Sequence, residues 1–152
     1  MNWKKGRGKL GVLDPLIGSW VAHADSEMGP VTCFRTFART LGGKYVELRV
    51  RWEFGQSVYE DLTLFGVGDD KVLSFWSFTS DGKRSSGKLA KATDVHEQTI
   101  AFEAQMPAGL ARQVYWPDID VGFHWAVESR NKKGWKRFVQ HQYQPAPHGA
   151  ES

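Results

Sequence analysis

Cysteine is almost missing from this chain: Cys33 stands alone among 152 residues. No intramolecular disulfide can form, which is typical of proteins kept in a reducing compartment. The basic segment 1–9 is not followed by the apolar stretch of a secretory signal. No run of about 18 apolar residues occurs, so a membrane-spanning helix is not expected. These scarcities predict a cytoplasmic protein without a membrane span.

The sequence also has few of the motifs that carry chemistry. Positive and negative charges are interspersed, and a net charge of +3 without a binding motif does not indicate a nucleic-acid partner. No two histidines have the close spacing of a zinc site and Cys33 is alone, so no metal site is expected. A Gly-x-Ser-x-Gly elbow and a phosphate-binding glycine loop are absent. No catalytic residue is assigned on this basis.

Aromatic residues are abundant, with 7 Trp, 9 Phe and 4 Tyr. Large aromatics favour strands and fill broad interiors. Segments with strand composition recur at a spacing of about 8–12 residues, separated by Gly, Pro, Asn and Asp turns. The expected strands cover 16–24, 31–40, 44–54, 58–67, 72–79, 84–92, 99–106, 112–116, 121–129 and 135–143.

So regular a meander predicts an all-β fold, an antiparallel up-and-down β-barrel of about ten strands, because closure removes exposed sheet edges. The expected organisation is a basic lead-in at 1–12, a barrel domain at 13–144 and a tail at 145–152. Segment 10–16 can form one helical turn before the first strand. Segment 72–79 is apolar on both faces, which leaves its inward side open and makes a homodimer possible. The facing of 31–40 is also left open.

Segment 44–54 is the clearest strand, because apolar and polar residues alternate strictly along it. We expect Glu47, Arg49 and Arg51 to point outward. The opposite, inward face is expected to carry Val46, Leu48, Val50, Trp52 and Phe54.

The first strand has an unusual face. Gly18, Trp20, Ala22 and Ala24 lie on one side when counted in steps of two. The indole of Trp20 can close one end of a barrel, and the small residues beyond it can leave space.

The segment Gly18-Ser19-Trp20 resembles the Gly-x-Trp start of calycin barrels, the superfamily of lipocalins and fatty-acid-binding proteins. About ten strands without an obvious helical lid resemble the nitrobindin-like branch and the uncharacterised bacterial calycin-like proteins near it, and segments 41–46 and 133–135 also resemble that uncharacterised group. In calycins the tryptophan packs across a barrel end under an arginine from the last strand. The resemblance therefore implies that Arg137 covers Trp20 as a structural plug.

The barrel is expected to bind a small apolar or amphipathic molecule, with no cofactor. Strand parity places the cavity wall on the face shared with Trp20, the apolar side of 44–54 and Arg137. His141 and Tyr143 would orient a polar head group. The predicted wall consists of Ala22, Ala24, Val50, Trp52, Trp125, Val139, His141 and Tyr143.

Two alternatives remain open. Nitrobindins bind haem through a histidine close to the C-terminus, and His141 has a comparable place. However, their first strand reads Gly-x-Trp-x-Gly-x-Gly, and Ala22 and Ala24 add methyl groups where a flat macrocycle would lie. The other alternative is an enzyme on the same scaffold that uses Arg137, His141 and Tyr143 as acid, base or oxyanion clamp.

Overall fold

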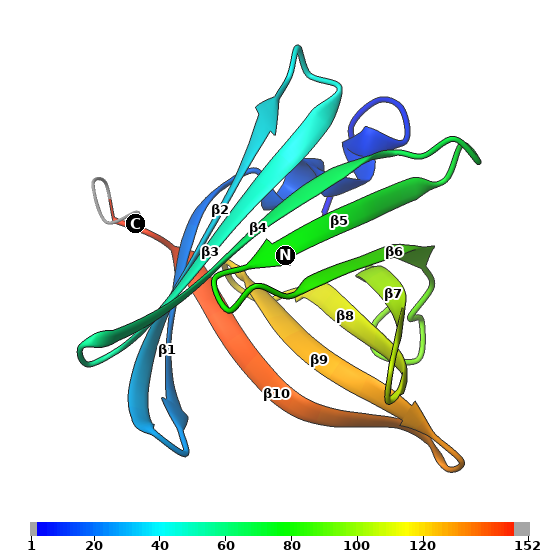
Figure 1. Ribbon diagram of the computed structural model, residues 1–152. Coiled ribbons are helices and arrows are strands. Elements are labelled where there is room, and N and C mark those ends of the chain that lie inside the picture. The colour runs from blue at the N-terminus through cyan, green and yellow to red at the C-terminus, as the bar shows by residue number, and fades with distance from the viewer. Residues whose placement is uncertain (1–2, 148–152) are drawn as a thin grey trace.

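Ten antiparallel strands close into one barrel in the computed structural model of the chain, which describes residues 3–147 (Figure 1). Each strand pairs with the next along the chain, and β1 pairs with β10 to complete the ring. The predicted all-β, up-and-down antiparallel barrel is therefore confirmed. The elements are the 3-10 helix η1 (Leu10–Leu16), β1 (Gly18–Ser26), β2 (Gly29–Thr40), β3 (Tyr45–Phe54), β4 (Ser57–Val67), β5 (Leu73–Thr79), β6 (Arg84–Ala90), β7 (Ile100–Met106), β8 (Gly109–Pro117), β9 (Phe123–Asn131) and β10 (Gly134–Pro145).

The strand ends differ from the predicted ranges by up to three residues, and the differences in β8 and β10 affect the turns and the closure of the ring. β8 begins before segment 112–116, because Pro107 and Ala108 alone make the turn after β7. β10 runs to Pro145, which pairs with Trp20 of β1. The ring is thus closed by the first residue of the predicted tail 145–152, of which 148–152 lie outside the described residues. Across residues 3–147, no helix combines the length and the apolar character needed to cross a membrane.

The pleat of β3 follows the predicted alternation. Val46, Leu48 and Val50 are at most 3% exposed, whereas Arg49 lies outside and pairs with Glu47. Cross-strand pairing extends this inward face to both neighbours and settles the facing of the two undecided strands. β2 points Val31, Cys33, Arg35 and Phe37 inward, and β5 points Leu73, Phe75 and Ser77 inward with Trp76 and Phe78 outside.

One end of the barrel is closed by η1 together with Trp20. Leu13 and Leu16 of η1 are fully buried, and the Trp20 indole Nε1 donates a hydrogen bond to the Leu16 carbonyl oxygen at 2.8 Å. The Trp20 ring meets Phe123 edge to face, with centroids 4.9 Å apart. Gly18 has a φ of 138°, a conformation that side chains disfavour, which explains the glycine of the Gly-x-Trp segment. Trp20 therefore joins η1 to the barrel wall.

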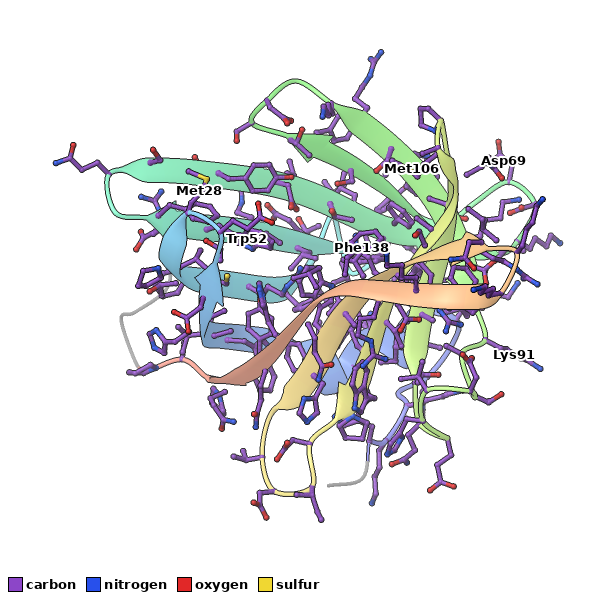
Figure 2. All side chains as sticks on the ribbon, turned by 90° about the horizontal axis from the view of Figure 1, so that it is seen from below. Met28, Trp52, Asp69, Lys91, Met106 and Phe138 are labelled. Carbon is purple, nitrogen blue, oxygen red and sulfur yellow. The ribbon has the colours of Figure 1, made fainter. Side chains whose placement is uncertain are left out.

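The prediction that Arg137 covers Trp20 is wrong, because β10 contains a bulge. The register shifts between Arg137 and Val139, leaving Phe138 61% exposed (Figure 2). Val139 pairs with Val127 and faces inward, whereas Arg137 pairs with Glu128 on the outer face. Counting in steps of two along β10 fails at this extra residue. The Arg137 guanidinium instead lies over the Trp116 ring, with its carbon 4.9 Å from the centroid.

Arg137 belongs to a paired charge cluster outside the barrel. Its Nε donates to Glu128 Oε2 at 2.8 Å, and Arg112 Nε donates to Glu128 Oε1 at 2.8 Å. Arg112 also donates two hydrogen bonds to the Asp94 carboxylate, and only 2% of its side chain is exposed. The cluster therefore holds segment 91–99, which carries Asp94, against the outer face of the barrel.

Replacing Glu128 by alanine tests this cluster. Glu128→Ala leaves the Arg112 guanidinium buried with one carboxylate fewer, and such unpaired charge is strongly destabilising. We expect the free energy of unfolding, measured by urea denaturation, to fall by about 3 kcal/mol. The control Glu47→Ala breaks a pair with the exposed Arg49 and should change it by less than about 1 kcal/mol. Equal losses in the two variants would contradict a structural role for Glu128.

Candidate functional site

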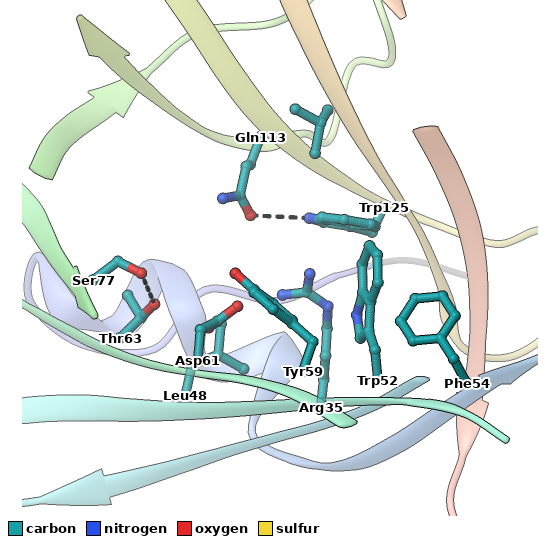
Figure 3. A pocket seen from close by; sticks show the side chains of 11 residues that line it. Arg35, Leu48, Trp52, Phe54, Tyr59, Asp61, Thr63, Ser77, Gln113 and Trp125 are labelled. Carbon is teal, nitrogen blue, oxygen red and sulfur yellow. Dashed lines mark hydrogen bonds between the residues drawn. The ribbon is translucent and has the colours of Figure 1, made fainter. Parts of the chain in front are cut away.

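A cavity of about 400 Å³ occupies the half of the barrel beyond the closed end. Its walls come from β2 to β5 on one side and from β8 and β9 on the other (Figure 3). A second void of about 20 Å³ lies next to this cavity, and Leu48, Thr63 and Gln113 line both. The lining residues of the larger cavity are Arg35, Leu48, Trp52, Phe54, Tyr59, Asp61, Thr63, Ser77, Gln113, Trp125 and Val127.

The guanidinium of Arg35 is the fixed charge of this cavity. The residue is 3% exposed and projects from β2 into the barrel. Its Nε donates to the Tyr143 hydroxyl at 3.1 Å, and its Nη1 donates to the Tyr115 hydroxyl at 2.8 Å. Its central carbon lies 4.1 Å from the Trp125 ring centroid. Among residues 3–147, Nη2 has no hydrogen-bond acceptor, and no carboxylate forms an ion pair with Arg35.

Asp61 is the acidic group of the same cavity. It lies on β4, where it pairs with Val50, and Val50 pairs in turn with Arg35. Burial raises the pKa of the Asp61 carboxyl to about 6, although the positive charge of Arg35 opposes this. In the view of Figure 3 the Arg35 guanidinium stands between the Tyr59 ring and the Trp52 indole, with Asp61 on the far side of Tyr59. The cavity therefore holds a permanent cation beside a carboxyl that titrates close to neutral pH.

The remaining polar groups are largely bonded to one another. Thr63 donates to the Ser77 hydroxyl at 3.1 Å, and the Trp125 indole donates to Gln113 Oε1 at 3.0 Å (Figure 3). The Trp52 Nε1 is buried without an acceptor within the described part of the chain. These pairings leave the Arg35 guanidinium and the Asp61 carboxyl as the charged groups able to orient a ligand.

The eight residues of the predicted cavity wall all face the barrel interior, but only two of them line the cavity. Cross-strand pairing turns all eight residues toward the barrel interior. Trp52 and Trp125 line the cavity, whereas Ala24 and Val139 are half-buried against the core. The others are buried beside it, because Tyr143 and Arg35 fill the space next to β1. This buried group comprises Ala22, Val50, His141 and Tyr143.

Arg35 and Asp61 line the cavity but are not among the site residues predicted from the sequence, because the prediction considers each strand without the strands that pair with it. Arg35 follows Val31 and Cys33 in steps of two and precedes Phe37, so it is a charge on an apolar face. Such a position is the signal that could have found it. Asp61 directly follows Glu60, and the pairing of Asp61 with Val50 shows that Asp61 faces inward and Glu60 outward.

The structure does not fit haem at His141. The imidazole is 7% exposed and lies between two indoles, with ring centroids 5.2 Å from both Trp52 and Trp125. Its Nδ1 is buried without a partner in the described chain. Burial, and then the charge of Arg35, lower the pKa of His141 to about 4, so the ring is neutral. A neutral imidazole can bind iron, but His141 does not line the cavity and aromatic rings cover it.

The residues proposed for an enzyme are not brought together. Arg137 lies outside the barrel, while His141 and Tyr143 lie inside it. The Tyr143 hydroxyl accepts a hydrogen bond from Arg35, and burial raises the pKa of this tyrosine. Residues 3–147 contain no cluster of three or more His, Cys, Asp or Glu side chains that could hold a metal ion.

The raised pKa of Asp61 predicts a pH-dependent stability. Because folding favours the protonated carboxyl, wild-type stability should fall relative to Asp61→Asn as the pH rises from about 4 through 6. The difference in unfolding free energy should grow by up to about 3 kcal/mol across this window, as measured by urea denaturation. The control Glu60→Gln alters the adjacent outward carboxyl and should show no such trend. A constant difference for Asp61→Asn would contradict the raised pKa.

Comparison with protein-family models finds none that matches this chain, and no curated protein matches its sequence. The function proposed next therefore rests on the geometry of the cavity.

Proposed function

We propose that this protein binds a small apolar or amphipathic molecule inside the barrel. The observation that carries the proposal is the cavity of about 400 Å³ with aromatic walls. Trp52, Phe54 and Trp125 provide flat apolar surface, and the volume is within the roughly 300–1,000 Å³ of small-molecule pockets. A few polar groups among apolar walls are typical of such pockets.

The packing around the cavity supports binding without large rearrangement. The Trp52 ring contacts Phe54 and Tyr59 at centroid distances of 6.1 and 5.9 Å, and Trp125 edge to face at 6.1 Å. These rings hold one another in place, so a ligand would meet a largely preformed wall. Burying apolar ligand surface against it contributes about 25 cal/mol per Å². A closed ten-strand barrel is also compatible with a calycin-like fold, and that likeness supports the same function.

Titration with the neutral dye N-phenyl-1-naphthylamine tests the proposal. We expect saturable binding of one dye per chain, with quenching of tryptophan fluorescence because Trp52 and Trp125 line the cavity. Ser77→Trp should abolish this binding, because Ser77 points into the cavity from β5 and an indole there would fill it. Ser86→Trp is the matched control, since Ser86 lies outside on β6 and pairs with the outward Trp76.

Circular dichroism should show an unchanged strand spectrum in both variants. Absence of saturable dye binding to the wild-type protein would overturn the proposed function. Equal dye binding to Ser77→Trp and wild type would place the binding site outside this cavity.

A further inference from the structure

Arg35 is a buried cation whose described hydrogen-bond acceptors are neutral. Both tyrosine hydroxyls that accept from it are uncharged, and no ion pair to a described carboxylate compensates it. A guanidinium keeps its charge at every accessible pH, so Arg35 cannot lower the free-energy cost of its burial by losing a proton. Asp61 acts on Arg35 through its charge without an ion pair between them, so an anion in direct contact with the guanidinium would add the ion pair that the described chain does not supply.

We propose that the occupant of the cavity is a monocarboxylic acid with an aromatic or branched apolar body, whose carboxylate pairs with Arg35 while Asp61 takes up one proton. This inference rests on the proposed function, because it names the class of ligand that the same cavity binds.

The residues that contact Arg35 fix the orientation of its guanidinium group, including the edge that carries Nη2. Tyr143 and Tyr115 hold Nε and Nη1, and the Trp125 ring lies against the guanidinium at 4.1 Å. Arg35 lines the cavity, and its Nη2 has no acceptor among the described residues. Guanidinium edges bind carboxylates through short charge-assisted hydrogen bonds. The aromatic residues Trp52 and Phe54 would then cover the apolar body of the ligand.

The proton uptake follows from bringing a ligand carboxylate into the cavity that Asp61 also lines. A bound carboxylate near Asp61 raises the cost of ionising Asp61, because like charges at short range disfavour each other. The ligand enters as its anion, one proton passes from solvent to an Asp61 Oδ, and the protonated carboxyl can donate to the ligand. No covalent bond changes. A cationic ligand is disfavoured, because the charge of Arg35 persists in the same cavity.

The other groups around Asp61 keep a constant protonation state in the relevant range. Burial raises the pKa of Tyr59 and of Tyr115 to about 12, and the pKa of Tyr143 further. His141 has a pKa lowered to about 4 and that of Cys33 is raised to about 11. Asp61 is thus the group among these that changes charge between about pH 5 and 8.

Calorimetric titration with 2-naphthoate and with the neutral 2-naphthalenemethanol tests this inference. A carboxylic acid with a pKa of about 4 stays ionised from pH 5.5 to 8. We expect naphthoate to bind at least about tenfold tighter than the alcohol at pH 5.5. Above pH 6 its affinity should fall by about tenfold per pH unit, while that of the alcohol stays constant. Titrations in two buffers of different ionisation enthalpy should show uptake of about one proton at pH 7.5.

Two variants separate the roles of the charged groups. Arg35→Met should remove the preference for naphthoate over the alcohol. Asp61→Asn should abolish proton uptake and strengthen naphthoate binding at pH 7.5 by about 30-fold. Arg49→Met and Glu60→Gln are the matched controls, because Arg49 lies on the outer face of β3, next to β2, and Glu60 on the outer face of β4 beside Asp61. If Arg35→Met fails to fold by circular dichroism, the Asp61→Asn result decides alone.

Equal affinities for the acid and the alcohol at pH 5.5, or naphthoate binding without proton uptake at pH 7.5, would overturn this inference while leaving the proposed function in place. Tighter binding of 2-naphthylmethylamine that is lost in Asp61→Asn would also overturn it, by making Asp61 the anchor. If neither ligand nor the neutral dye binds, the proposed function itself is wrong.

Discussion

The burial of one permanent positive charge, that of Arg35, constrains the interior of this barrel. The guanidinium is held by two tyrosine hydroxyls and an indole face, so it stays at the centre of the lumen. Its field acts on the other ionisable groups there: it opposes the burial that raises the pKa of Asp61, and it adds to the burial that lowers the pKa of His141. The lumen is therefore a polarised space in which one carboxyl can change charge near neutral pH.

The outer face of the barrel carries a second buried arginine, Arg112, whose charge is compensated by carboxylates. Arg112 is as buried as Arg35, but it contacts the carboxylates of both Asp94 and Glu128. Glu128 in turn accepts from Arg137, which completes a closed cluster. Such pairing accounts for Arg112 as a structural residue that holds segment 91–99. Arg35 has no equivalent partner in the described chain, and this contrast directs attention to the cavity beside it.

The sequence predicted the barrel well because its signals are local. Strict alternation in 44–54 fixes the pleat of β3, and the glycine-rich turns fix the order of the strands. The Arg137 prediction failed because the bulge at Phe138 inserts one residue, and no turn residue marks it. Arg35 shares one face of β2 with Val31 and Cys33, and the pairing across β1, β2 and β3 shows that this face is inward.

The cavity does not lie beside the small residues of β1, as the sequence predicts, and the packing across neighbouring strands explains why. Small residues along one strand, such as Ala22 and Ala24 on β1, leave no space where large side chains of the neighbouring strand fill the interior: Ala22 is 2% exposed, and Tyr143 of β10 is fully buried. Space opens where small residues line up across strands. Thr63, Ser77 and Ser85 form such a row, because Thr63 pairs with Ser77 and Ser77 with Ser85. The hydroxyl groups of Thr63 and Ser77 give one wall of the cavity a polar surface, and the opposite wall carries the Trp125 indole. A molecule lying between these walls would need both a polar and an apolar side, which favours an amphipathic ligand over a purely apolar one.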